Sequence, residues 1–287
     1  MNTNMPVQSG TMARTRRRGG TWWRVLLLAF GMYILGVVIL FVTHNPVLFP
    51  TVSMLGSFMF PVAYVAFFYE HRHLSELSLP TLALTFLYGG LLGVFAASIL
   101  EPLFIAKLNL LTAFEVGVIE EFVKILGVLV IARRGRHDSQ LDGMILGAAA
   151  GMSFAALESM GYAFSALLRS GGSLSATVGL TLMRGLLSPL GHGTWTAILV
   201  GVLFRESSGG RFRINRAVAG AFLTVVVLHA LWDGLPDLVG QVTGSFLDVL
   251  ISQTVIGLVG VFILWRRWRE AVRRQGEMEQ IERTLQA

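Results

Sequence analysis

Residues 25–42 read VLLLAFGMYILGVVILFV, an apolar run that contains no charged residue. A run of this length is typical of a helix that crosses a membrane. The basic residues before it (Arg14, Arg16, Arg17 and Arg18) resemble the start of a secretory signal. The run is long for the core of a signal, however, and no small-residue cleavage site follows it. The sequence therefore predicts a first membrane helix that is retained.

The composition extends this prediction to the whole chain. Of its 287 residues, 54% are hydrophobic and only 14% are charged, and the mean hydropathy is +0.66. Soluble domains carry roughly 25% charged residues. These values exclude an ordinary soluble enzyme, a disordered chain and a nucleic-acid-binding domain. The absence of cysteine excludes a disulfide framework, a thiolate nucleophile and a cysteine-ligated metal. The expected fold class is all-α: a polytopic integral membrane helical bundle.

Breaks rich in Pro, Gly, Asn and charge divide the chain into about eight apolar segments. The sixth segment contains Pro189 between Gly185 and Gly191, which predicts a kink or a broken helix there. The expected transmembrane helices are 22–42, 51–69, 81–100, 110–132, 143–168, 175–204, 217–238 and 247–265.

The basic residues predict the orientation of these helices. Nineteen of the 23 Lys and Arg residues fall in alternate connections or in the two ends of the chain, as the positive-inside rule expects of cytoplasmic segments. We therefore expect an even number of helices in the cell membrane, with both termini cytoplasmic. Residues 1–21 are expected to form a basic, disordered cytoplasmic tail, residues 22–265 the transmembrane domain, and residues 266–287 a charged cytoplasmic tail with the character of a surface helix.

Ionisable residues inside the spans indicate a functional site, because each costs several kcal/mol in lipid. Glu120, His192 and His229 each lie 13 residues from a basic residue at the end of their helix, and Glu158 is 15 residues from Gly143. At 1.5 Å per residue these side chains lie roughly 20–22 Å deep, in one layer. The candidate site residues are Glu120, Glu121 and Lys124 in GVIEEFVKILG, Glu158 in GMSFAALESMGYA, Arg184, His192 in PLGHGTWTA, and His229 and Asp233 in HALWD.

Helical spacing predicts how some of these residues interact. Glu120 and Lys124 share a face at i,i+4, so the lysine can keep a carboxylate charged, and Asp233 at i+4 can orient the His229 imidazole. A stripe of small residues repeats every fourth position at Gly143, Gly147, Gly151 and Ala155. Such a stripe permits close helix packing. We expect it to bring 143–168 against 110–132, so that Glu158 faces the two glutamates across a polar cavity.

Two chemistries use such a set. A glutamate can take a proton from water while an imidazole stabilises the developing oxyanion. Alternatively, two imidazoles and a carboxylate can hold Zn²⁺ or another divalent metal that binds the water, although the HExxH motif is absent. A proton-coupled transporter is a rival interpretation, but it would favour polar residues in both halves of the chain. A non-catalytic membrane scaffold is a third alternative.

Four motifs in order, EEFVK (120–124), FAALE (154–158), GHGTWTA (191–197) and HALWD (229–233), resemble the PrsW family of intramembrane proteases. That family is grouped with the CAAX-processing endopeptidases and the bacteriocin-immunity-type membrane proteins. The resemblance covers 110–238, which is the expected catalytic core. It implies a bacterial protease that cleaves single-span membrane proteins, such as anti-sigma factors. Its expected partners are this substrate and the lipid bilayer, with no nucleic acid.

The resemblance also implies residue roles. Glu120 and Glu121 match the paired glutamates of the family, and Ser159 stands where the family pattern has Asn. Whether the mechanism needs metal, and which of the paired glutamates is the base, stay open at this point. The expected catalytic residues are Glu120, Glu121, Glu158, His192, His229 and Asp233, the supporting residues are Lys124 and Arg184, and the metal ligands of a metal-dependent enzyme are His192, His229 and Glu158.

Overall fold

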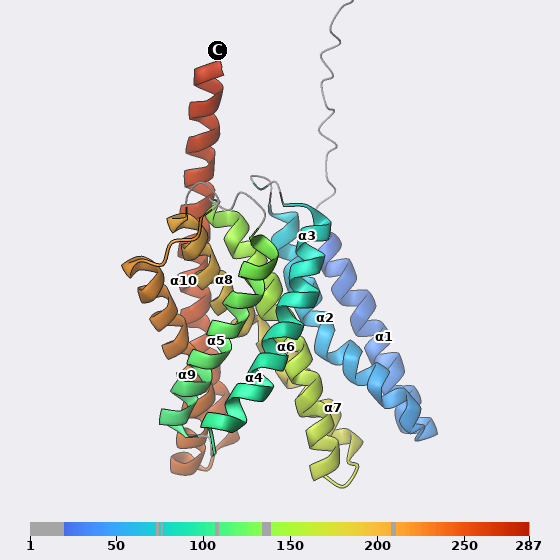
Figure 1. The fold of residues 1–287 in the computed structure, drawn as a ribbon. Helices are drawn as coiled ribbons and strands as arrows, with labels where there is room; N and C mark the ends of the chain where they lie inside the picture. The colour runs from blue at the N-terminus through green and yellow to red at the C-terminus, as the bar shows by residue number, and fades with distance from the viewer. Residues whose placement is uncertain are drawn as a thin grey trace, which may run out of the picture.

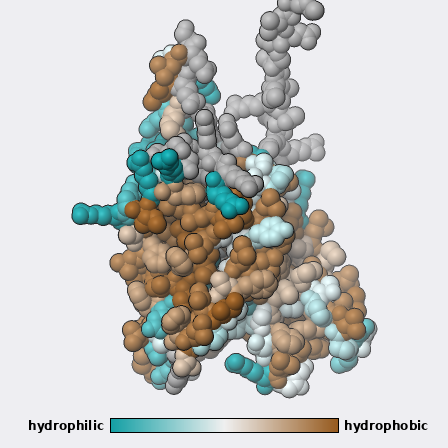
Figure 2. Space-filling model, viewed as in Figure 1, coloured by the Kyte–Doolittle hydropathy of each residue, from teal (hydrophilic) through white to brown (hydrophobic). Residues whose placement is uncertain are grey.

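The structure is a computed structural model that describes residues 20–72, 75, 77–106, 109–133, 139–207 and 211–286. All of the secondary-structure elements in these ranges are helices, which confirms the all-α fold class. The expected N-terminal tail 1–21 lies outside the described residues, apart from Gly20 and Thr21. Figure 1 shows the helices as one bundle, and Figure 2 shows apolar side chains across the middle of its visible face.

Several of the helices begin where the sequence supplies a capping side chain. Asn109, Ser139, Ser173 and Asn215 each accept a hydrogen bond from a backbone N–H of the first turn, which satisfies groups that a helix start leaves unpaired. The α-helices are α1 (Thr21–Thr43), α2 (Phe49–Glu70), α3 (Leu79–Leu84), α4 (Gly90–Phe104), α5 (Leu110–Ala132), α6 (Gln140–Arg169), α7 (Leu174–Leu187), α8 (His192–Glu206), α9 (Arg216–Thr243) and α10 (Phe246–Gln286). The short elements are η1 (Pro46–Leu48), the π-helical turn η2 (Thr85–Gly89) and η3 (Ser188–Leu190).

Seven helical segments of the described chain are long and apolar enough to cross a membrane. The expected span 110–132 is indeed a helix, α5, but it is not among the seven, and it carries Glu115, Glu120, Glu121 and Lys124. It packs against α4 and α9 within the bundle. The count of eight spans therefore stays a prediction. Figure 1 shows that α1 begins and α10 ends at the same end of the bundle.

The sixth expected span is broken, as Pro189 predicts. Helix α7 ends at Leu187, the 3₁₀ turn η3 contains the proline, and α8 begins at His192. Gly191 links the two elements with φ −108° and ψ −117°, outside the helical region. The break therefore places a helix N-terminus, and His192 with it, in the bundle interior.

The small-residue stripe of α6 packs against α8 and not against α5 as expected, although α6 also contacts α5 elsewhere. A Cβ on Gly143 would lie 2.6 Å from the Val200 carbonyl oxygen. A Cβ on Gly147 or Gly151 would overlap the carbonyl oxygens of Thr196 and His192, respectively. These glycines let the backbone of α8 approach α6 closely, and the most N-terminal contact on α8 is at His192 itself.

The C-terminal tail continues the last helix. Helix α10 runs without a break for 41 residues, from Phe246 to Gln286. Its end projects beyond the rest of the bundle in Figure 1. The expected tail 266–287 is therefore an extension of the last expected span rather than a separate surface helix.

Candidate active site

The sequence-predicted site residues all meet in the bundle interior. Helix α5 supplies Glu120, Glu121 and Lys124, and α9 supplies His229 and Asp233. Gly117 lets these two helices approach, because a Cβ there would lie 3.0 Å from the Val226 carbonyl oxygen and 3.3 Å from the His229 Cβ. Glu158 comes from α6, Arg184 from α7 and His192 from the first residue of α8.

Lys124 lies at the centre of the group. Its Nζ donates to Glu120 Oε2 and to Glu121 Oε1, both at 2.9 Å, and lies 2.8 Å from His192 Nδ1. The Phe154 ring lies 4.1 Å from the same nitrogen. The lysine side chain is 0% exposed. Because a buried charge needs partners, this ammonium and the paired glutamates form one unit.

The paired glutamates have different surroundings. The Glu121 carboxylate accepts from Lys124 and from Thr196 Oγ1 at 3.2 Å, and its Oε1 lies 3.1 Å from His229 Nδ1. Both of its oxygens are therefore engaged. Glu120 Oε2 lies 3.5 Å from His229 Nε2 and 3.7 Å from His192 Nδ1. Glu120 is thus the glutamate that faces both imidazoles.

The two imidazoles lie side by side. Their ring centroids are 5.1 Å apart, and the buried Trp195 ring packs on both, at 5.4 Å from His192 and 4.8 Å from His229. His229 Nε2 lies 3.2 Å from Asp233 Oδ2, the expected i,i+4 contact. The geometry of that contact is not that of a hydrogen bond, and this buried nitrogen has no hydrogen-bond partner in the described chain.

On its other side, His192 faces an ion pair. His192 Nε2 lies 3.2 Å from Glu158 Oε2, which also accepts from Arg184 Nη2 at 2.8 Å. Arg184 Nε donates to Ser159 Oγ at 3.2 Å. Ser159, which departs from the family pattern, thus accepts a hydrogen bond from Arg184. Arg184 in turn fixes the carboxylate that orients His192.

The described chain contains one group of side chains that could hold a metal ion, and its carboxylate differs from the expected one. One ligand atom each from Glu120, His192 and His229 lies within 4.8 Å of the others. Ligands about 2.1 Å from a tetrahedral zinc lie roughly 3.4 Å apart, close to the 3.5 and 3.7 Å found around Glu120 Oε2. The unpaired His229 Nε2 also suits a ligand. Glu158 is not part of this group, and its carboxylate pairs with Arg184.

The donor set and its spacing therefore fit a two-histidine, one-carboxylate metal site. Lys124 Nζ contacts two of the three donor residues, at Glu120 Oε2 and His192 Nδ1. A bound cation would have to displace the ammonium from these atoms.

Sequence reasoning missed two residues of the group. Thr196 follows His192 by one helical turn, and this spacing is a usable signal. Glu101, on α4, lies close enough to Glu120 for the two carboxyl groups to interact. The third span was expected to end at residue 100, whereas α4 continues to Phe104 and so includes Glu101.

Comparison with known proteins adds one finding. The profile of one family, described as PrsW family intramembrane metalloprotease, matches residues 78–265. This range includes all of the site residues described above. Neither the curated proteins nor the solved structures contain a significant match to the chain.

Proposed function

The chain belongs to the PrsW family of intramembrane metalloproteases, and from this premise we propose that it is an endopeptidase that hydrolyses a peptide bond within the membrane. The observation that carries the proposal is the contact of Glu120 with both imidazoles in a buried polar group. By the resemblance described above, the substrate is a single-span membrane protein, such as an anti-sigma factor. The site of action is the cell membrane.

Glu120 is the general base of the proposed reaction. Lys124 pairs with both glutamates, but the Glu120 carboxylate faces both imidazoles, whereas the Glu121 carboxylate is also engaged by Thr196 and His229. A water molecule beside Glu120 Oε2 would pass its proton to this carboxylate as its oxygen attacks the substrate carbonyl. Glu121 is then a positioning residue that holds the His229 ring.

The imidazoles and the start of α8 stabilise the negative charge that develops on the carbonyl oxygen. Glu158 orients His192, and Asp233 lies beside His229. Helix α8 begins at His192 without a capping side chain. The positive end of its dipole therefore lies at the reacting atoms, where it favours an oxyanion.

In a metal-dependent form of the reaction, Glu120, His192 and His229 would hold the ion, so Glu120 would act as a ligand instead of as the base, and the ion would polarise the carbonyl and lower the pKa of water. This metal-dependent form predicts about one equivalent of a divalent metal, measured by elemental analysis, in purified wild-type protein. It also predicts that His229→Ala and Glu120→Gln lower this content, whereas Glu158→Gln does not. Full proteolytic activity of a metal-free sample would contradict the metal-dependent form of the mechanism.

The decisive experiment compares protein N-termini in membranes of cells that produce the wild type, Glu120→Gln, Glu121→Gln or Glu115→Gln. Glu115 is the matched control, because it lies on the same helix and is exposed. New termini within transmembrane segments are expected with the wild type and with Glu115→Gln. Glu120→Gln should lose them by at least 100-fold, because a lost general base costs roughly 10²–10⁴-fold.

Two results would count against the proposal. Equal amounts of these termini with the wild type and with Glu120→Gln would remove Glu120 as the base. An absence of Glu120-dependent termini, together with proton-coupled uptake in reconstituted vesicles, would instead favour the transporter interpretation.

A further inference from the structure

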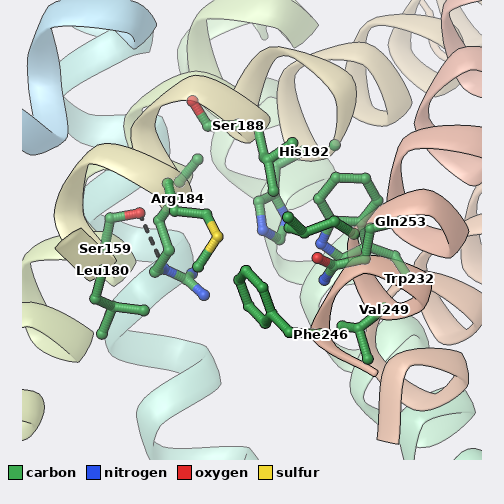
Figure 3. Close-up of a pocket in the computed structure, with 14 residues that line it drawn as sticks. Ser159, Leu180, Arg184, Ser188, His192, Trp232, Phe246, Val249 and Gln253 are labelled. Carbon is green, nitrogen blue, oxygen red and sulfur yellow. Dashed lines mark hydrogen bonds between the residues drawn. The ribbon is translucent and has the colours of Figure 1, made fainter. Parts of the chain in front are cut away.

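A cavity of about 210 Å³ opens beside His192 (Figure 3). One wall comes from α7, through Leu180, Met183 and Leu187, and the opposite wall comes from the first turns of α10, through Phe246 and Leu250. The sequence predicts a polar cavity among 110–238. This cavity instead lies between α7 and α10, with mainly apolar walls.

The size of the cavity limits what it can hold. An apolar cavity of about 150 Å³ accommodates a benzene molecule. The volume beside His192 therefore suits one large aliphatic or aromatic side chain. A whole helix, with a diameter of about 10–12 Å, does not fit.

The inner end of the cavity is part of the candidate active site. His192 lines it, and the same imidazole lies 3.7 Å from Glu120 Oε2 through its Nδ1. Arg184, which binds Glu158, also lines it. A peptide carbonyl held against His192 would therefore bring the side chain of an adjacent residue to the cavity.

The cavity also offers polar groups to a peptide backbone. Gln253 lines it, lies near Trp232 in Figure 3, and its side-chain amide makes no hydrogen bond in the described chain. A substrate segment that unwinds inside a membrane exposes N–H and C=O groups that lack water. An amide can both donate to and accept from such groups.

We propose that this cavity is a specificity subsite, which holds one large apolar side chain of the substrate next to the bond that is cleaved. Resting on the proposed function, the inference adds a substrate class: segments with Leu, Ile, Met or Phe beside the cleaved bond. Helices α7 and α10 thereby act as the selecting walls, and α5, α8 and α9 carry out the chemistry.

The first test measures binding without proteolysis. The probe is N-acetyl-p-benzoylphenylalanine methylamide, photolysed with the full chain in lipid nanodiscs, with the adducts mapped by mass spectrometry. Adducts are expected within 180–187 and 246–253. Leu250→Trp, which fills the cavity, should lower them about tenfold. Leu247→Trp is the matched control, because Leu247 is 64% exposed on the same helix and does not line the cavity. Glu120→Gln should label like the wild type.

The second test uses the cleaved termini described above. Wild-type cuts should lie next to large apolar residues, and Leu250→Trp should shift them several-fold toward Ala and Gly, while Leu247→Trp leaves them unchanged. An unchanged preference in Leu250→Trp, or labelling that this variant does not reduce, would overturn the subsite. An absence of Glu120-dependent cuts would instead contradict the proposed function, because photolabelling needs no proteolysis. Thermal unfolding of both Trp variants shows whether a loss of labelling or cleavage is due to misfolding.

Discussion

The single ammonium of Lys124 pairs with two buried carboxylates. The free energy of unfolding should therefore depend on this side chain. Its Nζ lies 2.9 Å from an oxygen of each of Glu120 and Glu121. Lys124→Met would leave both charges unpaired. Removing one partner of a buried pair costs about 3–5 kcal/mol. The expected result is a fall of this size in the free energy of unfolding, measured by denaturant titration in detergent micelles.

The control for this prediction is Arg273→Met, because Arg273 is 73% exposed and lies 3.9 Å from Glu277. An exposed pair of this kind contributes little. A second variant, Lys124→Met with Glu120→Gln and Glu121→Gln, should recover part of the lost stability because the unpaired charges are gone. Equal stability of Lys124→Met and the wild type would contradict the role given to the ammonium.

Depth along a helix predicted which side chains lie close together, but not the role of each one. The 13-residue spacings correctly indicated that Glu120, His192 and His229 share one group, because a straight helix converts residue number into depth. The choice between Glu120 and Glu121 depends on rotation about the helix and on Thr196, which come from the packing. The position of Glu158 likewise depends on Arg184, on another helix. The sequence alone therefore could not predict which carboxylate joins His192 and His229 in the group that could hold a metal ion.

The fit of α6 against α8 predicts the effect of one methyl group. In Gly151→Ala the new Cβ would overlap the His192 carbonyl oxygen, which is backbone and cannot rotate away. We expect a loss of about 1–3 kcal/mol in the free energy of unfolding, as for other overpacked cores. Cleavage should fall as well, because His192 moves with its backbone. Denaturant titration and the N-terminal comparison measure the two effects.

Gly161→Ala is the matched control on the same helix, since a Cβ there meets nothing within 4 Å. Replacing an exposed helical Gly by Ala typically adds about 0.5–1 kcal/mol, so this variant should be slightly more stable than the wild type and equally active. If the two alanine variants behaved alike, the close approach at Gly151 would not position His192.

Where a helix breaks could be predicted from the sequence, because the signal is local. Which helix packs against which could not, because that depends on the rest of the bundle. Pro189 lacks an N–H and disfavours a continuous helix, and it stands between Gly185 and Gly191, so the break between α7 and α8 could be predicted. A proline alone is no sufficient signal, because Pro61, Pro102 and Pro236 lie inside helices. The glycine stripe of α6 indicated a close neighbour, but any helix can fill such a groove. Its neighbour turned out to be α8, and only packing of the whole bundle selects it.

Charge asymmetry and the arrangement of the bundle together predict how the chain crosses the membrane. The connections that are rich in Arg and the end of α10 should lie on the cytoplasmic side. In Figure 1 the end of α10 and the start of α1 lie at one end of the bundle, as an even number of crossings requires. Helix α5 is the crossing that needs a test, because its charges set it apart from the seven apolar spans.

Cysteine labelling tests this topology, because the native chain contains no cysteine. Single substitutions Val47→Cys, Ser175→Cys and Val242→Cys should react with a membrane-impermeant maleimide added to right-side-out vesicles. Arg213→Cys and Thr284→Cys should react only after the vesicles are opened. If α5 does not cross, every later position changes side, so Ser175→Cys and Val242→Cys would be protected while Val47→Cys still reacts. Leu111→Cys, at the exposed start of α5, should label from the same side as Val47→Cys. Labelling of Val47→Cys, Ser175→Cys and Val242→Cys from outside, with protection of Arg213→Cys and Thr284→Cys, would establish eight crossings. Helix α5 would then carry its glutamates and Lys124 through the membrane.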